Sequence, residues 1–192
     1  MRALVVGTGA IGREIARLLR AVGMEVCGAG RNARSGDADF GDVVASADLV
    51  DHVGDVDHLV VAAPLTDQTR GLVDTEVFEA MKPTAHLVNI GRGPVVDEQA
   101  LVKALEAGEI AAASLDVFET EPLPPGNPLW VTRGVIISAH MSGDVVGWRD
   151  ALARQFVDNA ERWLADQPLS NVVDKRLGFA APVEPSRREE NA

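Results

Sequence analysis

The sequence is poor in cysteine and in positive charge. Cys27 is the single cysteine among 192 residues, which rules out a disulfide within the chain. Its place in the apolar run of residues 26–29 predicts a small buried side chain rather than a nucleophile. Lysine and arginine number 18 against 29 acidic residues, a net charge of −11. Without a basic surplus to neutralise phosphates, nucleic acid is not expected as a partner.

Long apolar runs and metal-binding clusters are also missing. No stretch of about 18 apolar residues is present, and Met1-Arg2 leads directly into an apolar strand pattern. We therefore expect no membrane span, no signal peptide and a cytoplasmic location. No group of His and Cys has the spacing of metal ligands, so no metal is expected. Ser142 lacks the strand-to-helix elbow that a nucleophilic serine requires.

The most informative pattern present is a glycine-rich run at residues 7–12, GTGAIG. It follows the apolar residues 3–6 and opens a helical pattern, which is the context in which G-x-G-x-x-G binds a dinucleotide. In this motif the first glycine allows a tight turn, and the second leaves the backbone bare so that a pyrophosphate can approach. The third allows the helix to pack closely on the strand, and the phosphates lie over the N-terminus of the helix. The residues predicted to form this phosphate site are Gly7, Gly9, Ala10, Ile11 and Gly12.

Short apolar runs alternate with amphipathic helical segments. Strands are predicted at residues 3–6, 25–29, 58–63, 86–90, 111–117 and 135–139, with a less certain one at 42–45. Helices are predicted over residues 11–22, from an N-cap at Asp97 to residue 107 before Gly108, and over residues 145–165. The strands are nearly continuously apolar, as expected when both faces of a parallel sheet are covered. The pattern predicts the α/β class: a doubly wound, Rossmann-like parallel sheet with a C-terminal helix.

The same pattern divides the chain into three parts. We expect residues 1–143 to form a dinucleotide-binding domain and residues 144–179 to hold the C-terminal helix and a return segment. Residues 180–192 are rich in proline and charge, which predicts a disordered tail. The first helix carries one apolar stripe, which predicts its buried face: Ile11, Ile15, Leu18, Leu19 and Val22.

Three successive predicted strands each end just before a polar side chain that can do chemistry. These side chains are Arg92, Glu121 and His140, and a parallel sheet brings them to the edge that also holds the glycine loop. Arg92 can bind a carboxylate through its forked donors, and His140 can move a proton, with Glu121 favouring its charged form. The set suits hydride transfer at an alcohol carbon next to a carboxylate. A chance placement of one histidine at this edge is the alternative.

Several longer motifs occur in an order that resembles the D-isomer-specific 2-hydroxyacid dehydrogenases, over roughly residues 3–179. They are PLT at 64–66, MKP at 81–83, VNIGRG at 88–93, VDE at 96–98, LDVF at 115–118 and SAH at 138–140. The resemblance implies that Arg92, Glu121 and His140 are the catalytic residues and that the protein is a homodimer. It also implies a cofactor lying along Pro64, Ile90, Gly91 and Asp116, with Asp116 near the nicotinamide amide. We assign Gly143 to the same cofactor site.

The end of the second predicted strand departs from the family pattern. NAD-preferring members place an acidic residue there to hold the ribose hydroxyls. That position looks like Gly30 here, followed by Arg31, with Arg34 close behind, so no carboxylate is expected to repel a 2′-phosphate. We predict that NADP is preferred over NAD and that Arg31 binds the 2′-phosphate. Alternatively, Arg31 is a solvated charge on the loop and does not bind the phosphate.

A second departure is that the residues forming most of the family's substrate domain do not precede the glycine loop. The resemblance then implies an oxidoreductase domain that transfers a hydride between NAD(P) and a small 2-hydroxy or 2-oxo acid, with one wall of its cleft missing. The alternative is a truncated NAD(P)-binding module with little or no turnover of its own. The sequence does not predict which side chain the substrate carries, because the pocket for that side chain would come largely from the missing part.

Overall fold

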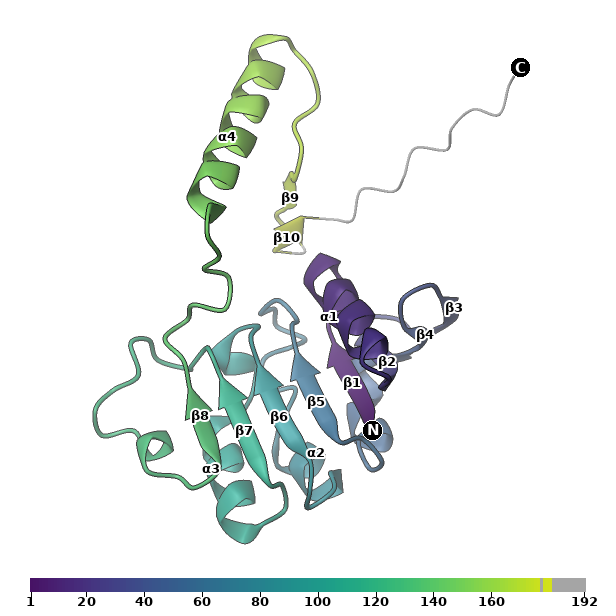
Figure 1. Cartoon of the computed structure of the whole chain (residues 1–192), viewed down its shortest axis with the longest axis vertical. Coiled ribbons are helices and arrows are strands. Elements are labelled where there is room, and N and C mark those ends of the chain that lie inside the picture. Colours follow the sequence, from purple (N-terminus) through teal and green to yellow (C-terminus); the bar gives the residue numbers. More distant parts are fainter. Residues whose placement is uncertain (177, 181–192) are drawn as a thin grey trace. The chain divides into compact units, whose positions relative to one another are not determined.

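The computed structural model describes residues 1–176 and 178–180 and divides into two compact units, Met1–Gly143 and Asp144–Ala192 (Figure 1). An eight-stranded sheet forms the centre of the first unit, in the order β3-β4-β2-β1-β5-β6-β7-β8. Every neighbouring pair is parallel except β3 with β4, which confirms the predicted α/β class. The strands are β1 (Arg2–Val6), β2 (Glu25–Gly30), β3 (Arg34–Asp37), β4 (Gly41–Ala45), β5 (His58–Val61), β6 (His86–Asn89), β7 (Ala112–Leu115) and β8 (Val135–Ile137).

The order of the strands defines where a ligand can bind. The chain runs outward from β1 through β2 to β4, and then returns to β5 on the other side of β1. In open parallel sheets the ligand crevice lies beyond the carboxyl ends of the strands at such a reversal. The glycine loop directly follows β1 and therefore lies at this point.

Strand β3 was not predicted from the sequence. Its residues are polar and its side chains are mostly exposed, so they lack the apolar run that marks the other strands. It pairs antiparallel with β4 through a register shift near Ser35 and Asp37. The uncertain strand at residues 42–45 is present as β4. Strands β3 and β4 thus form a short hairpin at the edge of the sheet.

The first helix, α1 (Ala10–Ala21), packs on one face of the sheet next to β1 and β2 (Figure 1). The predicted apolar stripe is only partly correct. Gly12 and Ala16 are the buried residues, because small side chains let the helix lie close to the strands. Ile15 and Leu19 pack beside them against the smaller of two apolar clusters. The remaining members of the stripe are exposed: Ile11, Leu18 and Val22.

The connections between the later strands cover the opposite face. They contain η1 (Ser46–His52), α2 (Thr75–Ala80) and α3 (Glu98–Ala107), which contribute to the larger apolar cluster. The predicted ends of α3 are confirmed: the Asp97 carboxylate accepts a hydrogen bond from Ala100 N at 2.9 Å, and Gly108 is left-handed with φ 73°. Two short turns, η2 (Gly93–Val95) and η3 (Pro128–Trp130), follow β6 and β7.

The second unit contains α4 (Trp148–Leu164) and a short antiparallel pair, β9 (Val173–Asp174) with β10 (Phe179–Ala180). Helix α4 begins at Trp148 rather than at residue 145, because Gly147 at its N-cap has a left-handed φ of 85°. None of its residues is buried, and its apolar side chains include Leu152, Phe156 and Trp163. Of the predicted tail, Ala180 belongs to β10, and residues 181–192 lie outside the described residues.

Two features of the described residues, 1–176 and 178–180, bear on function. None of their helices combines the length and apolar character that crossing a membrane requires. No group of three or more His, Cys, Asp or Glu in this part of the chain could hold a metal ion.

Candidate active site

The glycine loop after β1 has the backbone that a pyrophosphate site needs. Gly7 has φ 107°, and a Cβ there would lie 2.7 Å from the carbonyl carbon of Ala62. A Cβ on Gly12 would lie 1.8 Å from the oxygen of Gly7, so only glycine permits this approach of helix to loop. A Cβ on Gly9 would meet nothing within 4 Å, which leaves open space in front of the backbone.

The N-terminus of α1 is free to bind an anion. Its N-cap, Gly9, supplies no side-chain hydrogen bond, and its first turn carries no acidic residue. The first backbone N–H groups of a helix have no partner within the helix, and its dipole favours negative charge at this end. The predicted residues Ala10 and Ile11 begin this turn, so the structure fits a dinucleotide phosphate here.

The loop after β5 approaches the glycine loop closely, and the loop after β6 approaches the loop after β5. A Cβ on Gly91 would lie 2.7 Å from the oxygen of Ala63, and a Cβ on Gly7 would lie 2.7 Å from the carbonyl carbon of Ala62. Ile90 N donates to Val61 O at 3.0 Å, which continues the ladder between these two strand ends. The predicted cofactor residues Pro64, Ile90 and Gly91 therefore lie along one edge with the glycine loop.

The side chains of His140 and Glu121 form a hydrogen-bonded pair beyond the ends of β8 and β7. His140 Nδ1 lies 2.7 Å from Glu121 Oε2, and Glu121 Oε1 accepts a hydrogen bond from Phe118 N at 3.0 Å. Burial by itself raises the pKa of Glu121, but the hydrogen bonds from His140 and Phe118, together with the charges of His140 and Arg92, bring it below its usual value. An ionised Glu121 fixes the Nδ1–H tautomer of His140, which leaves Nε2 to exchange a proton.

Arg92 is exposed at the end of β6 between two tightly packed glycines. Its Nη1 donates to the oxygen of Gly91 at 2.6 Å. A Cβ on Gly93 would lie 1.8 Å from the carbonyl carbon of Phe118, so this loop lies directly against the loop that carries Glu121. The electrostatic effect of Arg92 on the pKa of Glu121 follows from this approach. The three predicted catalytic residues are thus close to one another at one edge.

The loop that carries Glu121 is tied to α3 by two acidic side chains that we did not predict. Glu119 Oε1 accepts a hydrogen bond from Glu98 N at 3.1 Å, and Glu98 Oε1 accepts one from Glu119 N at 2.5 Å. Glu98 Oε2 also accepts a hydrogen bond from Asn127 Nδ2 at 3.1 Å. In the sequence, Glu98 appeared as part of the VDE motif at residues 96–98. Its partner lies 21 residues away, beyond any local pattern.

Asp116 follows β7 and is 4% exposed. Its Oδ1 accepts hydrogen bonds from Ser138 Oγ and, at 2.9 Å, from Met141 N, and its Oδ2 accepts one from Ser142 N at 3.0 Å. Burial by itself raises the pKa of Asp116, but these hydrogen bonds lower it to about 2. Asp116 is therefore ionised and holds the loop on which His140 lies. Gly143, also predicted at the cofactor site, is the exposed residue that ends this loop and the first unit.

A carboxylate at the end of β3 is paired with two arginines, an arrangement that we did not predict from the sequence. Asp37 Oδ1 and Oδ2 accept hydrogen bonds from Arg13 at 3.0 and 3.1 Å, and Oδ2 also accepts them from Arg34 at 3.0 and 2.8 Å. Burial alone raises the pKa of Asp37, but both guanidinium groups hold it well below its usual range. Asp37 lies beside Arg34, but Gly30, the position at which NAD-preferring members carry an acidic residue, has no carboxylate. Because Asp37 is paired with two cations, its charge is compensated.

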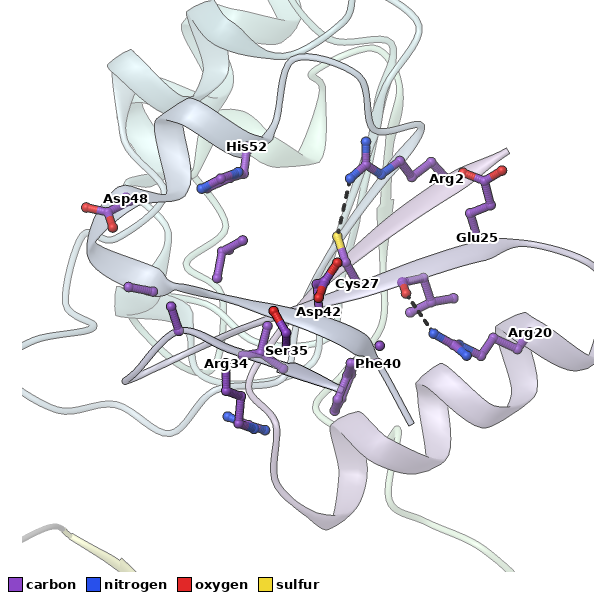
Figure 2. Close-up of a pocket in the computed structure, with 16 residues that line it drawn as sticks. Arg2, Arg20, Glu25, Cys27, Arg34, Ser35, Phe40, Asp42, Asp48 and His52 are labelled. Carbon is purple, nitrogen blue, oxygen red and sulfur yellow. Dashed lines mark hydrogen bonds between the residues drawn. The ribbon is translucent and has the colours of Figure 1, made fainter. Parts of the chain in front are cut away.

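A separate open pocket of about 1030 Å³ lies along β2 and β4 (Figure 2). Its lining includes Arg2, Cys27, Asp42 and His52, and none of the predicted catalytic or cofactor residues. The prediction of a buried Cys27 is only partly correct, because the side chain is half-buried beside this pocket. Burial raises the pKa of its thiol, although the nearby Arg2 opposes that rise.

A parallel sheet with a glycine loop at its point of reversal defines the class of this protein, a Rossmann-like dinucleotide-binding domain. The chain belongs to the D-isomer specific 2-hydroxyacid dehydrogenase family. The sequence model of that family's NAD binding domain matches residues 1–142.

Several similar proteins are described as reductases or dehydrogenases. Glyoxylate reductase of Aeropyrum pernix is 37% identical over 174 residues, which cover 90% of this chain and 51% of the relative. A 2-hydroxyacid dehydrogenase of Xanthobacter autotrophicus, solved with NADPH and MES, is 38% identical with a TM-score of 0.82, covering 93% of this chain and 73% of that one. An NADPH-dependent glyoxylate/hydroxypyruvate reductase of Sinorhizobium meliloti, solved with NADP and sulfate, is 30% identical with a TM-score of 0.84, covering 93% and 57%. The chain spans about half the length of the curated relatives that it matches.

Proposed function

We propose that this chain binds NADP(H) and supplies the proton-transfer and carboxylate-binding groups for interconversion of a small 2-hydroxy acid and its 2-oxo acid. The observation that carries the proposal is the His140–Glu121 pair, 2.7 Å apart, at the sheet edge that also holds the glycine loop. Similarity to glyoxylate and hydroxypyruvate reductases supports the substrate class.

The residues that would hold the dinucleotide are those of the glycine loop and of the neighbouring strand ends. The backbone at Gly9, Ala10 and Ile11 would bind the pyrophosphate, with Pro64, Ile90, Gly91, Asp116 and Gly143 further along the edge. When bound, a nicotinamide dinucleotide supplies the group that accepts or donates the hydride.

The residues of the chain perform the remaining steps. Arg92 presents its guanidinium at the edge, where its forked donors bind the carboxylate of the acid and orient the carbon that reacts. In the oxidation, His140 Nε2 takes the hydroxyl proton, and in the reduction it returns a proton to the forming oxygen. Glu121 holds the ring through Nδ1 and stabilises the imidazolium that forms.

The preference for NADP rests on the end of β2. Gly30 leaves no carboxylate at the position that selects against a 2′-phosphate, and Arg31 follows it directly. Two similar solved structures contain NADPH or NADP. We expect NADPH to bind more tightly than NADH in a fluorescence titration. Clearly tighter binding of NADH would contradict this proposal.

The Arg31→Ala variant tests the role of this residue. We expect it to weaken NADPH binding about tenfold or more while changing NADH binding little, because a charge-assisted contact to the 2′-phosphate is lost. Arg17→Ala is the matched control, since Arg17 pairs with Glu14 on the exposed surface of α1. Equal weakening of both cofactors by Arg31→Ala would argue against a phosphate contact.

Turnover tests the catalytic assignment. The chain is assayed with NADPH and glyoxylate or hydroxypyruvate, and His140→Gln is expected to lower kcat by about 10²-fold or more, because general acid–base catalysis is lost. His52→Gln, outside the candidate site, serves as the control. Full activity of His140→Gln would remove His140 from the mechanism.

A second candidate function is a binding module with little turnover of its own. The side chains of His140 and Glu121 are 48% and 34% exposed in this chain, which favours this reading, because acid–base groups work best when water is excluded. Tight NADPH binding without turnover would identify the module.

Residues 1–143 form the dinucleotide-binding domain, and residues 144–179 form a helix and return segment that meet the substrate domain of the family. The protein is a homodimer, which sedimentation equilibrium tests. Its location is cytoplasmic, which cell fractionation tests.

A further inference from the structure

One carboxylate accepts most of the hydrogen bonds that hold the loop carrying His140; the others join Ser138 N to Leu115 O and His140 to Glu121. Asp116 accepts hydrogen bonds from three groups of this loop, which are Ser138 Oγ, Met141 N and Ser142 N. Two of the donors follow His140 directly and one lies two residues before it. The loop is therefore held on both sides of the histidine by the same buried side chain.

The backbone of His140 explains why such an anchor is needed. His140 has φ 53°, a left-handed conformation that is unfavourable for a residue with a Cβ. A loop with this conformation relaxes unless the surrounding contacts hold it. The contact that depends on the conformation is the 2.7 Å pair between His140 Nδ1 and Glu121 Oε2.

We propose that Asp116 is a positioning residue, whose carboxylate holds the loop of residues 138–142 so that His140 keeps its contact with Glu121. The inference rests on the proposed function for its catalytic meaning, because His140 is there the group that moves the proton. Asp116 acts in this role through the loop, in addition to any contact with a cofactor.

The negative charge of Asp116 is essential to this role. All three groups of the loop donate, and an ionised carboxylate accepts at both oxygens. An asparagine would offer one accepting oxygen and one NH₂ group, which would face a donor. Asp116→Asn therefore keeps the size of the side chain while removing part of the anchor.

Two NMR measurements on the chain without cofactor test the proposal. In Asp116→Asn we expect hydrogen exchange of the Met141 and Ser142 amides to accelerate about tenfold or more, because hydrogen bonds to a charged group are lost. We also expect the pKa of Glu121 to rise, since His140 no longer donates to it. Wild-type values for both in a folded Asp116→Asn variant would overturn the proposal.

Asp97→Asn is the matched control, because Asp97 is also a carboxylate that accepts a backbone N–H, but at the start of α3. It is expected to leave both measurements at their wild-type values. A change as large as that in Asp116→Asn would show a general loosening of the fold and would overturn the proposal.

If Asp116→Asn does not fold, the Ser138→Ala variant tests whether Asp116 holds the loop of residues 138–142. It removes only the hydroxyl donor, so we expect a smaller change in the same direction. Hydrogen exchange of the Met141 and Ser142 amides should accelerate about threefold. No change in either measurement would overturn the proposal. Because neither measurement uses cofactor or substrate, a failure of the proposed function appears separately, as absent NADPH binding or turnover.

Discussion

The two faces of the sheet in the first unit differ in how completely they are covered. On the α2/α3 face, where η1, α2 and α3 pack, Leu4, Leu59 and Leu87 occupy one row across β1, β5 and β6, and all are fully buried. On the α1 face, a parallel row runs through Val5, Val60, Val88, Ser114 and Ile136. Val5 is buried, but Ile136 at the far end is 64% exposed.

Burial on the α1 face decreases from β1 to β8 because, within the first unit, α1 is the one helix that packs on that face. Helix α1 packs against β1 and β2, and Figure 1 shows no helix of the first unit in front of strands β5–β8. Apolar burial stabilises by roughly 25 cal/mol per Å². The α2/α3 face therefore holds β5–β8 together, and with them the loops that carry the candidate catalytic residues. The nearly continuous apolar strands predicted that both faces of the sheet are covered, but the α1 face of β8 is exposed at Ile136.

The largest expected effect separates the two faces directly. Leu87→Ala, on the α2/α3 face, is expected to lower the free energy of unfolding by about 2–5 kcal/mol, because it leaves a cavity in the larger cluster. Ile136→Ala, on the α1 face, is expected to change it by less than about 0.5 kcal/mol, as for an exposed site. Urea unfolding followed by circular dichroism measures both. A large loss in Ile136→Ala would mean that another surface covers this face.

A smaller effect concerns acid at the carboxyl ends of the strands. The pKa of Asp116 is about 2 in the folded chain and lower than in the unfolded chain. Its contribution to stability is therefore present above pH about 4 and is lost as the pH falls toward 2. We expect the free energy of unfolding to fall over this range, and to fall less steeply in Asp116→Asn. If the free energy of unfolding falls equally steeply with pH in the wild type and in Asp116→Asn, the lowered pKa assigned to Asp116 is wrong.

The smallest effect lies at the opposite ends of the strands, on the α1 face. His86 Nε2 lies 2.9 Å from Ser114 Oγ, and burial, with a smaller effect of the nearby His58, lowers the pKa of His86. Folding therefore favours its neutral form, and its contribution to stability is lost as the pH falls below about 6.5. An NMR titration of the His86 ring measures this pKa. A normal value would show that the α1 face is open to water here as well.

Elements that follow from local rules were predicted well. The glycine loop between β1 and α1, the Asp97 cap and the Gly108 end of α3 depend on residues within one or two turns, so sequence reveals them. Strand β3 and the start of α4 were not found, because a polar edge strand and a left-handed Gly147 leave no periodic signal. The predicted roles of the candidate site residues stay predictions.

The sequence by itself determined which groups stand at the ends of the strands: the glycine loop after β1, Arg92 after β6, Glu121 after β7 and His140 after β8. Only the tertiary structure decided which of them touch. The His140–Glu121 pair joins residues 19 apart, and Asp116 reaches its amide partners across 25 and 26 residues. Such contacts depend on strand order and on how closely glycines let loops approach, and no local pattern encodes either.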